Sequence, residues 1–193
     1  MAKARKSGAA KARKVPRATK AALARIRLLV LDVDGTLTDG RLYYGAQGEA
    51  LKVFDVRDGH GLRLLQLCGG VRLAALTGRR ADLVRLRCQE LGIEKIVERS
   101  RAKGVALRGL CAELGVPLEA TAFIGDDVND LPALELAGLA ACPADAVPEV
   151  LEACAFVSRF PGGRGAVREL CEALLGATVG WPPPEPAPDA LKT

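Results

Sequence analysis

Two short acidic segments contain the residues whose types and spacing could do chemistry. Residues 32–36 read DVDGT and residues 125–130 read GDDVND. On an extended backbone the side chains of Asp32 and Asp34 leave on the same side, and Gly35 lets the chain turn closely around a bound group. If the five carboxylates of these segments lie in one cleft, they repel one another unless a cation is present. Oxygen ligands suit a hard ion such as Mg²⁺. The acidic segments therefore predict a magnesium site.

The same residues favour phosphoryl transfer. A carboxylate such as Asp32 is ionised at neutral pH and can attack a phosphate ester without an activating base, which gives an acyl phosphate. Asp34 is then placed to protonate the leaving alkoxide and later to deprotonate the hydrolytic water. Charge on the phosphoryl oxygens needs donors besides the metal, and the Thr77 hydroxyl and the Lys103 ammonium are the candidates.

Alternating apolar runs and amphipathic stretches predict the elements that hold these residues. Short apolar runs indicate buried strands, and apolar residues at three- and four-residue steps indicate helices. The predicted strands are Ile26–Leu31, Val71–Leu76 and Thr121–Ile124, and the predicted helices are Arg80–Leu91 and Lys103–Leu114. This alternation predicts an α/β fold with a three-layer, doubly wound parallel sheet, in which ligands bind beyond the carboxyl ends of the strands.

Three other segments depart from this alternation. Residues 41–55 contain two strand-like pieces around Gly45–Gly48 and predict a β-hairpin that projects from the α/β body. We expect one phosphatase domain over residues 26–176, a disordered basic arm over 1–25 and a disordered Pro-rich tail over 177–193.

The charge of the chain is set by its first residues. The chain has 193 residues, and nine of its 28 Lys and Arg residues lie in residues 1–25, which contain no acid; the remaining 19 face 23 acidic residues. We favour a disordered extension over an arm that binds nucleic acid or an acidic membrane surface. No apolar stretch is long enough to span a membrane. The six cysteines form no C-x-x-C pair, which fits a reduced cytoplasm.

The motifs together resemble those of the haloacid dehalogenase superfamily. The resemblance covers roughly residues 26–175 and rests on D-x-D-G-T at residues 32–36, Thr77, Lys103 and G-D-D-x-x-D at residues 125–130. It implies a doubly wound α/β fold and Mg²⁺ as cofactor. An Asp at position 34 resembles the phosphatases of this superfamily, since the dehalogenases and P-type pumps lack it there.

The resemblance also implies roles for individual residues. Asp32 is expected to be the nucleophile and Asp34 the acid/base. The metal ligands are expected to be Asp32, the backbone carbonyl of Asp34 and Asp126. Asp127 and Asp130 are expected to support the metal-bound water and the lysine.

Further residues resemble those of one branch of this superfamily, the phosphatases that hydrolyse 3-deoxy-D-manno-octulosonate 8-phosphate in lipopolysaccharide sugar synthesis. The similarity lies in residues 56–61 (VRDGHG), 77–79 (TGR) and 162–169 (GGRGAVRE), and in the hairpin residues Glu49 and Lys52. It implies a homotetramer without a cap domain. Three arginines would bind the carboxylate and hydroxyls of the phosphorylated sugar acid: Arg57, Arg79 and Arg164.

Two alternatives stay open on the sequence. The first is a phosphatase of a nine-carbon sugar-acid 9-phosphate, against which Arg79 argues, because that branch is associated with an acidic residue there. The second is a catalytically silent domain kept for oligomerisation or regulation, against which the intact Asp32 and Lys103 argue. Two departures from the narrower pattern affect the substrate more than the catalysis: residues 98–102 lack a glycine-containing step, and Arg80 replaces a common Lys.

Overall fold

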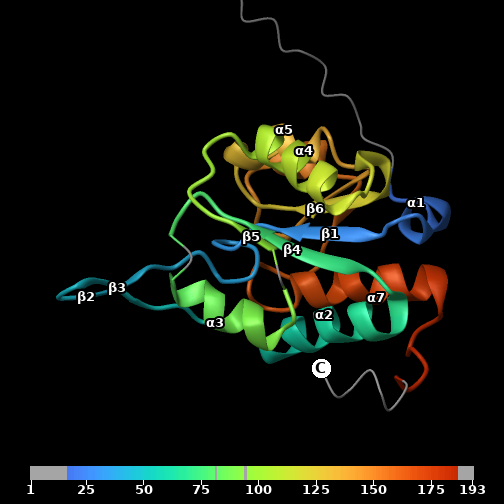
Figure 1. The fold of residues 1–193 in the computed structure, drawn as a ribbon, viewed down its shortest axis with the longest axis horizontal. Helices are drawn as coiled ribbons and strands as arrows, with labels where there is room; N and C mark the ends of the chain where they lie inside the picture. The colour runs from blue at the N-terminus through green and yellow to red at the C-terminus, as the bar shows by residue number, and fades with distance from the viewer. Residues whose placement is uncertain (1–16, 81, 94, 187–193) are drawn as a thin grey trace, which may run out of the picture.

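A six-stranded parallel sheet forms the centre of the molecule, with helices on both of its faces (Figure 1). The computed structural model describes residues 17–186, except 81 and 94. In spatial order the strands are β5 (Lys95–Val97), β4 (Arg72–Leu76), β1 (Leu28–Leu31), β6 (Thr121–Ile124), β7 (Leu139–Cys142) and β8 (Phe156–Val157). The prediction of a doubly wound parallel sheet is therefore confirmed.

The helices lie in two layers (Figure 1). One layer contains α1 (Lys20–Ala24), α2 (Val56–Gly69), α3 (Asp82–Glu90) and α7 (Ala166–Thr178). The other layer contains α4 (Lys103–Leu114), α5 (Leu131–Leu134) and α6 (Pro148–Ala153). The chain also forms two short 3₁₀ helices, η1 (Leu118–Ala120) and η2 (Val128–Asp130).

The central strand β1 explains why the core divides in two. All four of its residues are fully buried, and successive side chains of a strand point to opposite faces. Leu29 and Leu31 pack in the cluster beneath α2 and α7, whereas Leu28 and Val30 pack in the cluster beneath α4 and α5. A continuous apolar run is what a strand covered on both faces requires.

The register of the sheet brings the carboxyl ends of three strands together. Leu31 at the end of β1 pairs with Ala75 of β4 and with Ile124 of β6. The residues that follow these strands therefore lie beside one another at one edge, as the sequence predicts.

The predicted hairpin is present and projects from the body on the side of this edge (Figure 1). Its strands β2 (Tyr43–Gly45) and β3 (Gly48–Leu51) pair in antiparallel orientation. Between β1 and β4, where every residue is described, the chain forms only this hairpin and α2, so no cap domain is inserted there.

The two expected disordered ends differ in part from the structure. Within the arm, residues 17–25 are ordered: helix α1 begins after the cap Thr19 and packs along α7, and Ala18 donates its backbone N–H to Ala155. Ala18 and Leu23 reach the core, so the folded domain begins before residue 26. Residues 1–16 lie outside the described residues.

At the other end, helix α7 continues to Thr178, beyond the expected boundary. The guanidinium of Arg168 then lies over the Trp181 ring, with its Cζ 4.9 Å from the ring centroid. This contact orders the start of the expected tail, and residues 187–193 lie outside the described residues. No described helix is long and apolar enough to cross a membrane.

Candidate active site

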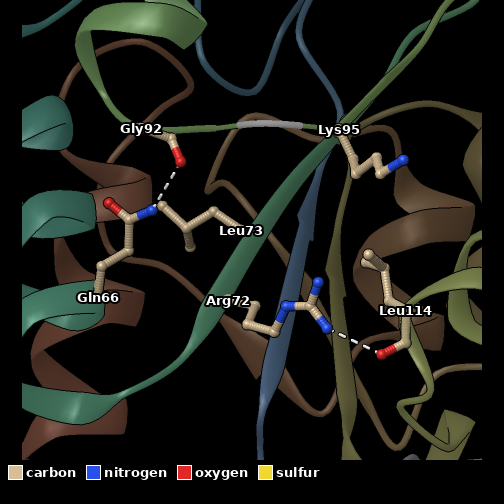
Figure 2. A pocket seen from close by; sticks show the side chains of 6 residues that line it. All are labelled: Gln66, Arg72, Leu73, Gly92, Lys95 and Leu114. Atoms are coloured by element: carbon tan, nitrogen blue, oxygen red, sulfur yellow. Dashed lines mark hydrogen bonds between the residues drawn. The ribbon is translucent and has the colours of Figure 1, made fainter. Parts of the chain in front are cut away.

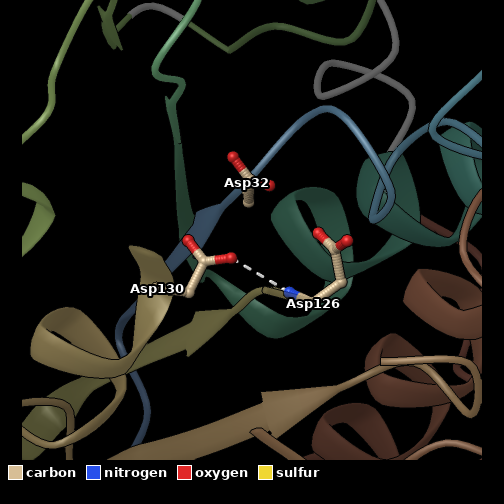
Figure 3. A group of neighbouring side chains, drawn as sticks. All are labelled: Asp32, Asp126 and Asp130. Atoms are coloured by element: carbon tan, nitrogen blue, oxygen red, sulfur yellow. Dashed lines mark hydrogen bonds between the residues drawn. The ribbon is translucent and has the colours of Figure 1, made fainter. Parts of the chain in front are cut away.

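Three carboxylates from two strand ends meet at the edge of the sheet. Asp32 follows β1, while Asp126 and Asp130 lie in the turn after β6, and one oxygen of each lies within 4.8 Å of the others (Figure 3). Asp32 and Asp130 are buried and Asp126 is partly buried. Such a cluster of oxygen ligands suits a hard divalent cation.

Lys103 lies between two of these carboxylates. Its Nζ donates to Asp32 Oδ1 at 2.6 Å and to Asp130 Oδ1 at 2.5 Å, and the side chain is only 2% exposed. Burial alone would lower the pKa of Lys103, but the attraction of Asp32 and Asp130 raises it overall. The ammonium therefore stays charged. Lys103 is the first residue of α4, as predicted, and this position directs it back to the strand ends.

Burial and mutual repulsion make it unfavourable for the acids of this cluster to be ionised together. Burial, followed by repulsion from Asp130, raises the pKa of Asp32 well above its ordinary value. The same two causes raise the pKa of Asp126 to about 6. A divalent cation would reverse both effects, because it stabilises the ionised carboxylates. The residues present therefore fit a bound Mg²⁺.

Asp34 points to a different set of partners. Its Oδ1 accepts a hydrogen bond from Lys52, and its Oδ2 lies 3.5 Å from the Thr77 hydroxyl and 4.0 Å from Arg79 Nε. Its side chain is 20% exposed, so the acid/base candidate is accessible while the nucleophile candidate Asp32 is buried. The Thr77 hydroxyl also accepts from the backbone N–H of Arg79 and so fixes the turn after β4.

The hairpin supplies two charged groups that the sequence analysis gave no role. Lys52, just after β3, is 2% exposed and lies 2.7 Å from Glu49 Oε1 as well as contacting Asp34. Glu49 in turn accepts from Arg79 Nη2 at 2.9 Å. The only signal in the sequence was their place in the narrower resemblance, because an isolated Glu and Lys on a hairpin are ordinarily solvated.

The turn after β6 is built by its own carboxylates. Asp130 Oδ2 accepts from the backbone N–H groups of Asp126 and Asp127, at 3.0 and 3.2 Å. Asp127 is exposed and caps η2 by accepting from Val128 N at 2.7 Å. The structure thus brings Asp126 and Asp130 to the cluster but leaves the Asp127 carboxylate out of it.

Gly35 is required by the close approach of Asp126. Its φ is +93°, and a Cβ at this position would lie 2.1 Å from Asp126 Oδ2. Thr36 Oγ1 donates to Asp126 Oδ1 at 3.3 Å. The nucleophile loop and the metal-binding turn are therefore in direct contact, and only glycine fits between them.

The three arginines predicted to bind substrate lie at two different places. Arg79 belongs to the carboxylate site through its contacts with Glu49 and Asp34. Arg57 and Arg164 are largely exposed and line a cavity of about 260 Å³ at the N-terminal ends of α2 and α7. Arg164 is connected to the site only loosely, through an ion pair of 3.7 Å with Asp39.

A second cavity lies at the amino end of β4, away from the carboxylates (Figure 2). Its volume is about 150 Å³, and its lining consists of Gln66, Arg72, Leu73, Gly92, Lys95 and Leu114. Three of its polar groups already have protein partners: Arg72 donates to Leu114 O at 2.8 Å, Gln66 donates to Gly92 O at 3.0 Å, and Lys95 pairs with Glu113. The buried Gln66 Oε1 has no partner among the described residues, but the cavity brings no carboxylate or nucleophile beside it. The carboxylate cluster is therefore the better candidate for chemistry.

Comparisons with known proteins agree with this site. Residues 74–169 match the family model of the haloacid dehalogenase-like hydrolases. The chain is 46% identical, over 150 residues, to the 3-deoxy-D-manno-octulosonate 8-phosphate phosphatase of Escherichia coli K12, covering 78% of this chain and 79% of the relative.

Solved structures give the same result. The Yersinia pestis 3-deoxy-D-manno-octulosonate 8-phosphate phosphatase is 45% identical, with a TM-score of 0.79 over 82% of this chain and 85% of that one. The Moraxella catarrhalis phosphatase, solved with magnesium, phosphate and the sugar acid KDO, is 38% identical, with a TM-score of 0.80 over 82% and 91% of the two chains.

The fold and the site thus define a phosphatase of the haloacid dehalogenase class, and the chain belongs to the haloacid dehalogenase-like hydrolases. Within that family its place is the 3-deoxy-D-manno-octulosonate 8-phosphate phosphatase branch. The resemblance inferred from the motifs is therefore confirmed.

Proposed function

We propose that this chain hydrolyses 3-deoxy-D-manno-octulosonate 8-phosphate to the free sugar acid and phosphate. The observation that carries the proposal is the convergence of Asp32, Asp126 and Lys103 at the strand ends, with Asp34 beside them. The curated relatives that share 46% identity carry this name. A silent regulatory domain would have no use for a buried lysine between two carboxylates.

The reaction follows from the two carboxylates at positions 32 and 34. Asp32 attacks the phosphorus while Asp34 donates a proton to the leaving sugar alkoxide, which gives an aspartyl phosphate and the sugar acid. Asp34 then takes a proton from water, and that water attacks the phosphorus and releases Asp32. Lys103 holds one oxygen of Asp32 in position and offsets negative charge in both steps.

Mg²⁺ is the proposed cofactor, with Asp32, Asp126 and the backbone carbonyl of Asp34 as its protein ligands. When bound, it neutralises charge on the transferred phosphoryl group. Asp130 orients Lys103 and the backbone of Asp126. Asp127 caps η2 and so fixes the turn that carries Asp126 and Asp130. The related Moraxella catarrhalis structure contains a magnesium ion and a phosphate ion.

The sugar acid is proposed to extend from the catalytic carboxylates toward the arginines. Arg79 lies at the phosphate end, and Arg57 and Arg164 line the cavity beyond it. A guanidinium binds a carboxylate with two parallel hydrogen bonds, so these residues suit the acid group of the substrate.

A substrate panel tests this proposal. Purified protein with Mg²⁺ is assayed for released phosphate on the eight-carbon sugar acid 8-phosphate, a nine-carbon sugar acid 9-phosphate and neutral sugar phosphates. We expect the eight-carbon ester to be preferred, EDTA to abolish release, and Asp32→Asn to be inactive. A preference for the nine-carbon ester would reassign the substrate, and no release from any ester would refute the phosphatase.

The protein is further proposed to work as a cytoplasmic homotetramer assembled through its hairpin. Large apolar side chains of this segment are exposed in the single chain, namely Leu42, Tyr43, Tyr44, Leu51 and Val53. Burial of such a surface is favourable. All six cysteines are free thiols, which agrees with a reducing compartment. Light scattering of the wild type and of Tyr44→Ser gives the mass directly: a monomeric wild type contradicts the assembly.

A further inference from the structure

Asp58 is a buried acid that the proposed reaction does not use. It lies in the first turn of α2, is 1% exposed, and takes part in no ion pair of the described residues. Its two oxygens instead accept from two backbone N–H groups of the segment that begins α7. Oδ2 accepts from Gly165 at 3.2 Å, and Oδ1 accepts from Arg168 at 2.7 Å.

These bonds give α7 a cap that its own sequence lacks. The N-cap residue of α7 is Gly165, with φ +109° and no side chain to accept from the first turn. A buried helix end needs partners for its free N–H groups, and Asp58 provides them from another helix. Gly61, one turn along α2, allows this approach, because a Cβ there would lie 2.9 Å from the Arg168 side chain.

The loop before α7 is held against the nucleophile loop by backbone contacts. Gly163 donates to Thr36 O at 2.9 Å. A Cβ at Gly162 would lie 1.7 Å from Gly35 O, and a Cβ at Gly163 would lie 2.5 Å from the backbone of Thr38. No side chain separates the two loops at these positions, so a shift of residues 162–165 is passed directly to Gly35.

The other end of the same loop is held separately. Glu169 accepts from the Ser158 hydroxyl and from Arg159 N, both at 2.7 Å, and Gly162 N donates to Asp145 at 2.9 Å. Asp58 is thus the side chain that fixes the end nearest α7. Burial of an ionised carboxylate costs free energy of desolvation. Burial accordingly raises the pKa of Asp58, although the hydrogen bonds from the two backbone N–H groups act in the opposite direction.

We infer that Asp58 is a positioning residue for catalysis, which holds residues 162–165 against the nucleophile loop and so sets the backbone of Gly35 beside Asp32. The inference rests on the proposed phosphatase function. It assigns to Asp58 an effect on the phosphoryl step itself, because a small displacement of the loop that carries the nucleophile Asp32 misaligns the attack and slows the reaction strongly.

The test compares Asp58→Ala with a control that loses a buried hydrogen bond elsewhere. Thr121→Val removes the bond from the Thr121 hydroxyl to Pro117 O, 3.0 Å long, at the amino end of β6. Both variants are expected to melt at a lower temperature than the wild type. At a temperature where circular dichroism finds all proteins folded, Asp58→Ala should lose about tenfold or more in kcat, and Thr121→Val should keep the wild-type kcat.

Two further measurements separate positioning from loss of stability. Inorganic phosphate, used as a competitive inhibitor with Mg²⁺, should bind more weakly to Asp58→Ala than to Thr121→Val. Asp58→Asn keeps one acceptor oxygen, so its kcat should lie between those of the wild type and Asp58→Ala. If Asp58→Ala does not fold, Gly162→Ala disturbs the same loop at its contact with Gly35 and should lower kcat in its place.

The outcomes are distinct. A wild-type kcat in folded Asp58→Ala, or an equal loss in Thr121→Val, overturns the positioning role. A wild type that releases no phosphate from any ester refutes the proposed function instead, whatever the variants do.

Discussion

Replacement of Lys103 gives the sharpest test of the site, because one buried cation holds two carboxylates. In Lys103→Met a chain of similar length remains, but Asp32 and Asp130 lose the ammonium that lies 2.6 and 2.5 Å from them. Removing one partner of a buried ion pair costs about 3–5 kcal/mol. That is a large part of the stability of about 5–15 kcal/mol typical of a domain.

Lys95→Met is the matched control. Lys95 also pairs with a carboxylate, Glu113, but its side chain is 42% exposed, and exposed pairs contribute about 0–1 kcal/mol. Urea unfolding in EDTA at neutral pH should therefore separate the two variants by roughly 2–5 kcal/mol. In Mg²⁺, phosphate release should fall by about 10²–10³ in Lys103→Met only, as for the loss of one transition-state donor.

The pH dependence has a defined sign. The pKa of Lys103 is raised in the folded state above its ordinary 10.5, so its contribution is fully present at neutral pH and is lost only in strong alkali. In Lys103→Met the remaining Asp32 has a raised pKa and takes up a proton as the pH falls, so the destabilisation should shrink in acid. Equal stability and activity of the two Met variants would refute this account of the site.

Three other results are expected at the same edge of the sheet. Mg²⁺ affinity, measured by calorimetry, should rise from about pH 5 to about pH 8 with release of protons, because metal binding must deprotonate Asp126, whose pKa is about 6; a pH-independent affinity contradicts this. Gly35→Ala should lose about 10²-fold or more in kcat, since its Cβ would overlap Asp126; wild-type kinetics would exclude the predicted overlap. Lys52→Met should lower kcat about tenfold or more, because Asp34 loses a charge-assisted hydrogen bond worth about 1.5–3 kcal/mol. An unchanged kcat would show that Lys52 has no part in the reaction.

The fold and the catalytic carboxylates could be predicted because local sequence signals determine them. Thr121–Ile124 and Lys103–Leu114 have the predicted bounds, and the hairpin lies inside residues 41–55. Parallel strands fix where their carboxyl ends meet, so the meeting of Asp32 with Asp126 followed from the alternation of strands and helices. The short helix α1 was missed, because nine basic residues without an acid outweighed the few apolar ones, Ala18 and Leu23 among them, that pack on the core.

The partners of the site could not be predicted, because tertiary packing selects them. Lys52 and Glu49 belong to a hairpin whose direction no local pattern encodes, yet Lys52 reaches Asp34 and Glu49 pairs with Lys52. The three arginines were grouped by their chemistry, whereas the structure separates Arg79 from Arg57 and Arg164. Which charged side chain pairs with which depends on distances that arise only after folding.

The nucleophile loop shows why glycines recur around this site. Gly35 has Asp126 on one side and the backbone of Gly162 on the other, and a Cβ on either glycine would lie closer than 2.5 Å to the facing group. The loop therefore cannot shift toward the metal-binding turn or away from it without a clash or a gap. Its position relative to Asp32 is then set by the Asp126 carboxylate on one side and by the main chain of Gly162 on the other. Rigid placement of this kind is what a reaction needs when its acceleration comes mainly from alignment and fixed charges.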